Sequence, residues 1–279
     1  MARRRVRPAQ REGLTMTTKY QNIRLEIAGS VATIVLSRPK QLNAISAGTH
    51  EELRDALDCV ENDKHVRCLV LTGEGRAFCS GQDLTERNVS DRSKLDLGAS
   101  LEANYNPLVR RLAAFPVPTI AAVNGPAAGA GANIALACDI ILMARSAYLQ
   151  QAFARIGLVP DAGGTWFLPR LVGLKLALAM CLFADRIPAE DCERMGIAWK
   201  VFDDDLFAAE VAKHAAILGA GPTLAYRLTK QALMASGMND LPAQLDLERD
   251  SQRQAGRSRD FMEGVMAFRE KRLPRFQGD

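Results

Sequence analysis

The sequence predicts an α/β fold that ends in a helical region, and three observations support that class. Apolar residues alternate on both sides of a Gly29-Ser30 turn, which indicates a β-hairpin near the start of the chain. Strand patterns then alternate with helical patterns, as they do in α/β proteins. Beyond Trp166 the spacing of the apolar residues is mostly helical.

The first elements follow from local patterns. The hairpin is expected at residues 23–27 and 31–36, where apolar and polar residues alternate. Ser46 suits the N-cap of a helix, because the apolar residues after it recur at helical spacing, namely Leu53, Ala56, Leu57 and Val60. A short β-branched run at residues 66–72 then predicts a strand.

The alternation continues through the middle of the chain. A helix is expected at residues 101–114, a buried strand at 118–123, a small-residue helix at 129–138 and a strand at 140–144. Further helices are expected at residues 174–184, 189–195, 206–218, 223–235, 241–256 and 258–271, with one strand at 199–202. Since no Pro/Gly/Ser linker or fixed-period repeat interrupts the chain, we expect the helical region to pack on the α/β part.

The net charge of +4 comes from an arginine cluster in the first dozen residues, namely Arg3, Arg4, Arg5, Arg7 and Arg11. A basic arm can bind nucleic acid or resemble a transit peptide. This one lacks an amphipathic repeat, and a second methionine occurs at Met16. Residues 1–19 are therefore expected to be an upstream start or a disordered basic extension, and no nucleic-acid partner is expected.

The composition, with 48% hydrophobic and 24% charged residues, is that of an ordinary soluble globular protein. The six cysteines lie mostly in apolar runs without a CxxC pair, which is typical of buried thiols in a reducing cytoplasm. The chain has only three histidines, His50, His65 and His214, so neither a metal site nor a histidine-based triad is expected. Asp139 interrupts the longest apolar stretch, residues 134–144, so no membrane span is expected.

Two glycine-containing loops follow predicted strands and lead into helices. They are residues 73–84 (GEGRAFCSGQDL) and 124–133 (NGPAAGAGAN). Small residues let backbone N–H groups approach a ligand, and two such loops favour a pair of amides that converge on one oxygen, as the enolate of a thioester requires. The alternative is that the glycines only permit tight turns and close helix packing. A nucleotide loop is disfavoured, because GxGxxG and GxxxxGK[ST] are both missing.

A third loop, residues 157–165 (GLVPDAGGT), carries one carboxylate between apolar residues and a diglycine. Asp161 is the only acid between Asp139 and Asp185. One interpretation is an N-cap for the following helix, a position that Asp favours. The other is that Asp161 points into an apolar cleft, where desolvation raises its pKa and makes it a competent general acid and base. The pattern alone leaves both open.

Several ordered blocks resemble the signatures of the enoyl-CoA hydratase/isomerase (crotonase) superfamily over residues 20–276. They are RP at 38–39, LNAI at 42–45, RAFCSGQDL at 76–84, AAVNG at 121–125, GAG at 129–131, PDAGG at 160–164 and EGVMAF at 263–268. The resemblance implies a crotonase-like spiral of ββα repeats over residues 20–210 and a C-terminal helical region over 211–279. It also implies a cytoplasmic homotrimer or dimer of trimers that acts on an acyl-CoA thioester, in which coenzyme A is part of the substrate and no metal or redox cofactor is needed.

The resemblance also implies roles for particular residues. The backbone amides of Gln82 and Ala130 would hold the thioester oxygen, and Asp161 would move protons. Substrate-binding positions would be Ala44, Asp83, Leu84 and Gly129. The apolar residues Phe153, Ile156, Leu158 and Trp166 would suit an aromatic acyl pocket, although a core role explains them equally well.

Two departures from the family pattern bear on the reaction. Hydratases of this family carry two glutamates that activate and protonate water, and the matching positions here are Asn133 and Phe153. Neither side chain can act as a base. Water addition is therefore disfavoured, and Asp161 stands where isomerases and dehalogenases of the family keep their catalytic aspartate.

Further stretches resemble the ring 1,2-epoxyphenylacetyl-CoA isomerases of bacterial phenylacetate catabolism: residues 81–89, residues 105–112, and residues 245–250 with 255–258. That resemblance implies conversion of a ring epoxide to an oxepin, and a shift of a β,γ double bond into conjugation. The alternatives are a general Δ3,Δ2-enoyl-CoA or dienoyl-CoA isomerase, an aryl-CoA dehalogenase, and a non-catalytic or RNA-binding relative.

Overall fold

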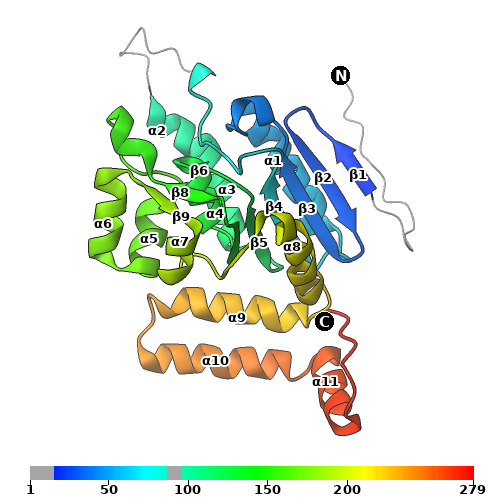
Figure 1. Ribbon diagram of the computed structural model, residues 1–279. Coiled ribbons are helices and arrows are strands. Elements are labelled where there is room, and N and C mark those ends of the chain that lie inside the picture. The colour runs from blue at the N-terminus through cyan, green and yellow to red at the C-terminus, as the bar shows by residue number, and fades with distance from the viewer. Residues whose placement is uncertain (1–15, 87–95) are drawn as a thin grey trace.

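The computed structural model describes residues 16–86 and 96–279 (Figure 1). The arginine cluster of residues 1–15 lies outside the described residues, and so do residues 87–89 of the stretch that resembles ring-epoxide isomerases. An α/β body occupies one side of the molecule, and the last three helices extend from it.

Seven strands of the described chain form the main sheet, in the order β1-β2-β3-β4-β5-β7-β10. The hairpin is confirmed, because β2 pairs antiparallel with β3 and Gly29 makes the turn with a positive φ of 56°. From β3 to β10 the strands run parallel, which requires the helical crossovers that the pattern predicted. The strands are β1 (Met16–Lys19), β2 (Ile23–Ala28), β3 (Val31–Leu36), β4 (Cys68–Gly73), β5 (Thr119–Val123), β7 (Ile140–Ala144) and β10 (Lys200–Phe202).

Strand β1 corrects the expected start of the folded part. Residues 16–19 fall within the extension that we expected to be disordered, but they pair antiparallel with β2 from Met16 opposite Ile27 to Lys19 opposite Arg24. The segment MTTK has no clear apolar alternation, so its conformation depends on the backbone edge that β2 offers. This tertiary contact is invisible in the local pattern.

Helices cover both faces of the sheet. Ile34 and Leu36 of β3 face α1, α3 and α4, whereas Val31, Thr33 and Val35 of the same strand face α8, because side chains of a strand alternate between its two faces. The predicted Ser46 cap is confirmed as a capping box with Thr49. The helices of this part are α1 (Ala47–Asn62), α2 (Leu97–Ser100), the π-helical η4 (Leu101–Tyr105), α3 (Asn106–Ala113), α4 (Ala130–Leu136), α5 (Gly164–Val172), α6 (Leu174–Phe183), α7 (Ala189–Arg194) and α8 (Asp204–Gly219).

A second, three-stranded sheet lies beside the main one and was not predicted. It contains β6 (Ala127–Ala128), β8 (Tyr148–Gln150) and β9 (Arg186–Pro188), with β8 in the centre. These strands have two or three residues each, too few to show a period. Strand β6 belongs to the second glycine loop, so this sheet helps to position it. Short 3₁₀ turns complete the body: η1 (Pro39–Gln41), η2 (Leu84–Glu86) and η5 (Ala152–Ile156).

The C-terminal region begins later than expected. The predicted boundary between residues 210 and 211 falls inside α8, which buries Phe207, Val211 and Ala215 against the sheet and therefore belongs to the α/β body. Helices α9 (Thr223–Ser236) and α10 (Leu241–Ala255) form a hairpin beside the body, and α11 (Arg259–Glu270) follows (Figure 1). The Lys230 ammonium of α9 joins this hairpin to the body through a 2.6 Å ion pair with Asp139.

Candidate active site

The two glycine loops lie edge to edge. The Ala128 N–H donates to the Cys79 carbonyl at 2.9 Å, and the Phe78 and Cys79 N–H groups both donate to the Pro126 carbonyl. Gly81 has a φ of 95°, and a Cβ there would lie 2.9 Å from Ala128 O. A side chain at this position would push the loops apart, so glycine is needed for their approach.

The approach brings Gln82 of the first loop next to Ala130 of the second. A Cβ built on the neighbouring Gly81 would lie 3.4 Å from the Ala130 nitrogen. The Ile45 N–H donates to the Gly81 carbonyl at 2.8 Å, and the Asp83 N–H donates to the Ile45 carbonyl at 2.9 Å. Alternate peptide groups of an extended chain point in opposite directions, so the Gln82 N–H points away from Ile45.

Ala130 is the first residue of α4, and Gly129 is its N-cap with a φ of 53° and a ψ of −129°. An N–H group in the first turn of a helix has no acceptor within the helix, and it can therefore serve a ligand. A Cβ at Gly131 would lie 2.4 Å from Cys79 O, so the first turn of α4 packs directly on the first loop. The glycines do permit close packing, as the alternative interpretation held, and this packing brings the two loops together.

Arg38 fixes the expected coenzyme A side of the site. Its guanidinium donates to the Ala44 carbonyl at 2.6 Å and forms a 2.8 Å ion pair with Asp83. The other Asp83 oxygen accepts from the Thr85 N–H and hydroxyl, and these bonds, together with Arg38, lower the pKa of Asp83. Both carboxylate oxygens of Asp83 therefore serve the protein itself. Leu84 is exposed and Ala44 is nearly buried.

Asp161 is not the N-cap of the helix that follows it. Helix α5 begins at Gly164 with Gly163 as its N-cap, so that alternative is wrong. Ala162 has a positive φ of 46°, which is strained for a residue with a side chain. The surrounding structure enforces this strained turn, in which Asp161 is half-buried.

The Asp161 carboxyl is in an environment that suits proton transfer. Its Oδ1 atom is buried and has no hydrogen-bond partner among the described residues. Burial raises the pKa of Asp161 from 3.8 to about 6, against the opposing effect of its own backbone N–H. A carboxyl with a pKa near neutrality can both accept and return a proton at physiological pH.

We expect Asp161→Asn to stabilise the protein at high pH. Because burial raises the pKa of Asp161 to about 6 in the folded state, the folded protein keeps a proton that the unfolded chain releases above pH ~4. Wild type therefore loses up to ~3 kcal/mol of unfolding free energy as the pH rises to 6, whereas asparagine does not titrate. The melting temperatures of the two proteins should nearly coincide at pH 4 and differ by about 5 °C or more at pH 8. A difference in melting temperature that did not grow with pH would show that the Asp161 carboxyl is not buried in the folded protein.

The loop of Asp161 is tied to α4. Asn133 of α4 donates from Nδ2 to the Asp161 backbone carbonyl at 2.8 Å. Gln151 donates from Nε2 to Asn133 Oδ1, also at 2.8 Å. Phe153, at the other position where the family pattern has a glutamate, is buried beside Gly129. Gln151 was missed in the sequence, because nothing in its local pattern shows that it meets Asn133.

Apolar residues close to Asp161 in the sequence are exposed. Ile156 and Val159 are 55% and 79% exposed, and Leu158 and Trp166 are also exposed, so these residues are not core. Only Phe153 of the four suggested pocket residues is buried. Exposed apolar groups beside a buried carboxyl are available to an apolar ligand.

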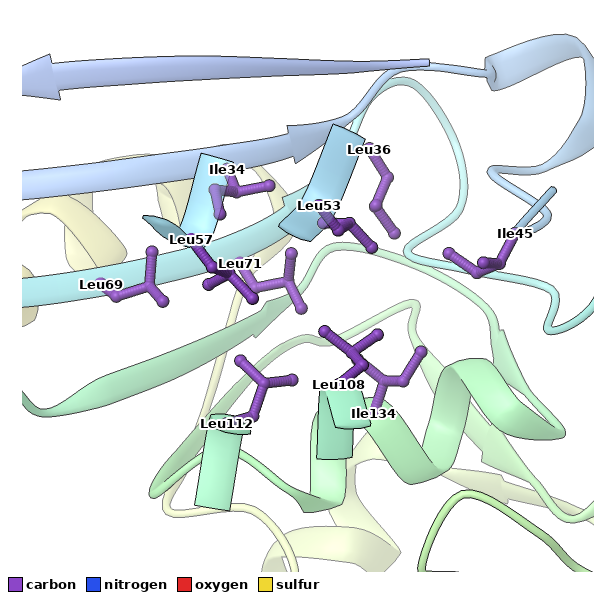
Figure 2. A pocket seen from close by; sticks show the side chains of 10 residues that line it. All are labelled: Ile34, Leu36, Ile45, Leu53, Leu57, Leu69, Leu71, Leu108, Leu112 and Ile134. Carbon is purple, nitrogen blue, oxygen red and sulfur yellow. The ribbon is translucent and has the colours of Figure 1, made fainter. Parts of the chain in front are cut away.

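An enclosed apolar gap lies elsewhere, between the sheet and the helices α1, α3 and α4 (Figure 2). Its volume is about 10 Å³, room for about one water molecule, and leucine and isoleucine side chains line it. A gap of this size without polar groups is a packing defect of the core. Ile134 joins it to the candidate site, because it lies on α4 one helical turn after Ala130.

No cluster of three histidine, cysteine, aspartate or glutamate side chains that could hold a metal occurs within residues 16–86 and 96–279. In the same part of the chain, no helix has both the length and the apolar character that crossing a membrane requires. All six cysteines are free thiols, and four of them are buried.

A family model described as "Enoyl-CoA hydratase/isomerase" matches residues 26–279. The chain belongs to the enoyl-CoA hydratase/isomerase family. The structural comparison agrees: enoyl-CoA hydratase from Bacillus anthracis has a TM-score of 0.85 at 31% identity, covering 93% of this chain and 100% of that one. The expected crotonase fold with a helical C-terminal region is therefore confirmed.

Two family members are especially similar. The chain is 49% identical over 249 residues to the 1,2-epoxyphenylacetyl-CoA isomerase of Escherichia coli K12, covering 89% of this chain and 95% of that protein. It is 48% identical over 259 residues to a Rhodobacter capsulatus protein named "Probable enoyl-CoA hydratase", covering 93% and 99%. One name denotes an isomerase and the other a hydratase. The choice between these two reactions must therefore be argued from the residues of the site.

Proposed function

We propose that this family member is an acyl-CoA isomerase in which the Gln82 and Ala130 amides stabilise a thioester enolate and Asp161 transfers the proton. The observation that carries the proposal is the buried Asp161 Oδ1, which has no partner among the described residues, beside two glycine loops in contact. A buried acceptor without a partner is costly for stability, and such cost is common where a substrate supplies the missing contact.

The two amides would act on the carbonyl oxygen of the thioester. When they donate to it, negative charge moves onto the oxygen and the proton on the adjacent carbon becomes more acidic. Their hydrogen bonds strengthen as the enolate forms, which is the property that accelerates a reaction. Both amides are fixed by backbone bonds and close packing, so little reorganisation is needed.

Asp161 would remove the proton from the carbon beside the carbonyl and return it to the γ-carbon. The electron pair of the broken C–H bond moves through the enolate, so that a β,γ double bond becomes an α,β double bond. Ring opening of an epoxidised phenylacetyl-CoA to an oxepin is also an isomerisation. Neither reaction changes the atom or electron count, so no redox cofactor is required.

Hydration fits this site less well. Addition of water needs groups that activate and protonate it, and the positions at which the family pattern has glutamates hold Asn133 and Phe153. The Asn133 amide already bonds to the Asp161 carbonyl and to Gln151, and an amide cannot act as a base. The similarity to the Escherichia coli isomerase supports an aromatic ring epoxide as substrate, and the exposed apolar residues beside Asp161 suit an aromatic acyl group.

The proposal includes the assembly and the binding of coenzyme A. The pantetheine and adenine part would lie along Ala44, Asp83 and Leu84, of which Arg38 joins Ala44 and Asp83. Gly129 would leave room beside the thioester. We further propose a cytoplasmic homotrimer or dimer of trimers, with no nucleic-acid partner.

A substrate panel tests the reaction. We expect turnover of epoxidised phenylacetyl-CoA or of a β,γ-unsaturated acyl-CoA. Hydration of crotonyl-CoA should be at least ~100-fold slower, because Asn133 and Phe153 stand where the family pattern has the glutamates that activate water. Product formation is followed by absorbance and mass. A general Δ3,Δ2 or dienoyl-CoA isomerase would accept the aliphatic substrates alone, and an aryl-CoA dehalogenase would release halide from a halogenated aryl-CoA. Faster hydration than isomerisation would overturn the proposal, and salt-dependent RNA binding without acyl-CoA turnover would favour a non-catalytic relative.

A further inference from the structure

One buried side chain connects the proposed base to the helix that presents an oxyanion amide. Asn133 lies on α4, three residues after Ala130, and is 0% exposed. Its Nδ2 atom donates to the backbone carbonyl of Asp161. The residue that would carry the carboxylate is thus anchored, through its own carbonyl, to the helix that carries the amide.

The Asp161 carbonyl determines which way round the Asn133 amide lies. A carbonyl oxygen can only accept, so Asn133 must turn its nitrogen to Asp161 and its oxygen to Gln151, whose Nε2 donates to it. Gln151 is 2% exposed, and burial keeps water from competing with these bonds. The chain of hydrogen bonds from Gln151 through Asn133 to Asp161 therefore has a single consistent arrangement.

The first residue of helix α5 packs against the Asn133 amide. A Cβ at Gly164, the first residue of α5, would lie 2.4 Å from Asn133 Nδ2 and 2.7 Å from Asn133 Oδ1. The backbone of α5 thus packs directly on the amide. The Asp161 loop is held by a hydrogen bond at its centre and by contact at its end, so the loop cannot shift without breaking both.

We propose that Asn133 is a positioning residue for the isomerase reaction, and that with Gln151 it fixes Asp161 relative to the Ala130 amide. The inference rests on the proposed function, because it needs Asp161 as the base. Asn133 acts through Asp161 and does not touch the substrate. Proton transfer requires approach to hydrogen-bond distance, and a misplacement of about 1 Å can cost ~100-fold in rate.

The test is the Asn133→Leu variant, which keeps a similar volume and removes both hydrogen bonds. We expect kcat to fall by about tenfold or more with KM within about twofold, because the substrate still binds. We also expect faster amide hydrogen exchange in residues 157–165. Water that enters the loosened loop should lower the pKa of Asp161 from about 6 toward its ordinary value of 3.8. The acid limb of the pH profile of kcat should move to lower pH by the same amount.

Gln151→Leu provides a second variant if Asn133→Leu does not fold. Gln151→Leu should also lower kcat. The double variant should be no slower than Asn133→Leu, because Gln151 acts through Asn133. The matched control is Gln150→Leu. Gln150 is also buried, but its amide donates to the Ala184 carbonyl, so kcat should stay within about twofold of wild type.

The outcomes separate this inference from the proposed function. Folded variants at Asn133 and Gln151 with wild-type kcat, pH profile and loop exchange would overturn the positioning role. A fall in melting temperature without those changes would also overturn it, since that is a merely structural role. If wild type showed no isomerase activity while the exchange of residues 157–165 still rose in Asn133→Leu, the anchoring of the loop would stand and the proposed reaction would fail.

Discussion

Replacing Asp161 by asparagine is expected to lower kcat by ~100-fold or more while KM changes little. Asparagine keeps the shape of the side chain but cannot accept a proton. The Oδ1 atom of the carboxyl is buried and has no hydrogen-bond partner among the described residues, so we expect no other described group to take over its role. The substrate should still bind, because binding depends on the amides and the coenzyme A side of the site.

Steady-state kinetics on a β,γ-unsaturated acyl-CoA measure this effect. Asp185→Asn is a suitable control, because Asp185 is the next acid along the chain, and its side chain is 73% exposed beside Arg155. That control should retain activity within about twofold of wild type. Activity of Asp161→Asn within about threefold of wild type would show that another group is the base, since general acid–base catalysis usually contributes 100-fold or more.

Removing the Ala130 N–H should lower kcat by about 100- to 1,000-fold, which is the usual effect of losing one oxyanion donor. Ala130→Pro achieves this removal. Proline is well tolerated at the first position of a helix, where its missing N–H breaks no intrahelical bond. Ala130 occupies that position, and the preceding Gly129 has no side chain to clash with the proline ring.

Ala130→Ser is the matched control, because serine keeps the N–H and adds only a small side chain. We expect Ala130→Pro to fold, with a melting temperature near that of Ala130→Ser, and to lose activity that Ala130→Ser retains. Equal kcat values for the two folded variants would mean that the amide of residue 130 does not contact the reacting oxygen.

Much of the fold was predictable because it rests on local patterns. The hairpin at β2 and β3 and the Ser46 cap of α1 lie where the alternation and the capping residues placed them. Strand β1 and the small β6-β8-β9 sheet were not predictable, because their short segments become strands only through pairing with neighbours. The start of the C-terminal region was misplaced because α8 buries one face on the sheet, a contact that helical spacing does not reveal.

The candidate site, like the fold, could be predicted only in part. Glycine-rich loops and a lone acid stood out in the sequence, and the structure brings the loops together through close contacts at Gly81 and Gly131. The two interpretations of Asp161 could be separated only once α5 was seen to begin at Gly164. The bond between Gln151 and Asn133 joins residues 18 positions apart and has no sequence signature.

Proton exchange at the carbon beside the thioester tests the central claim most directly. Phenylacetyl-CoA has acidic protons at that carbon but no epoxide to open, so NMR in D₂O isolates the step assigned to Asp161 and the two amides. We expect wild type to incorporate deuterium there well above the buffer rate, and Asp161→Asn to be slower by ~100-fold or more. Exchange at the buffer rate with wild type, or at the same rate with both proteins, would contradict the account.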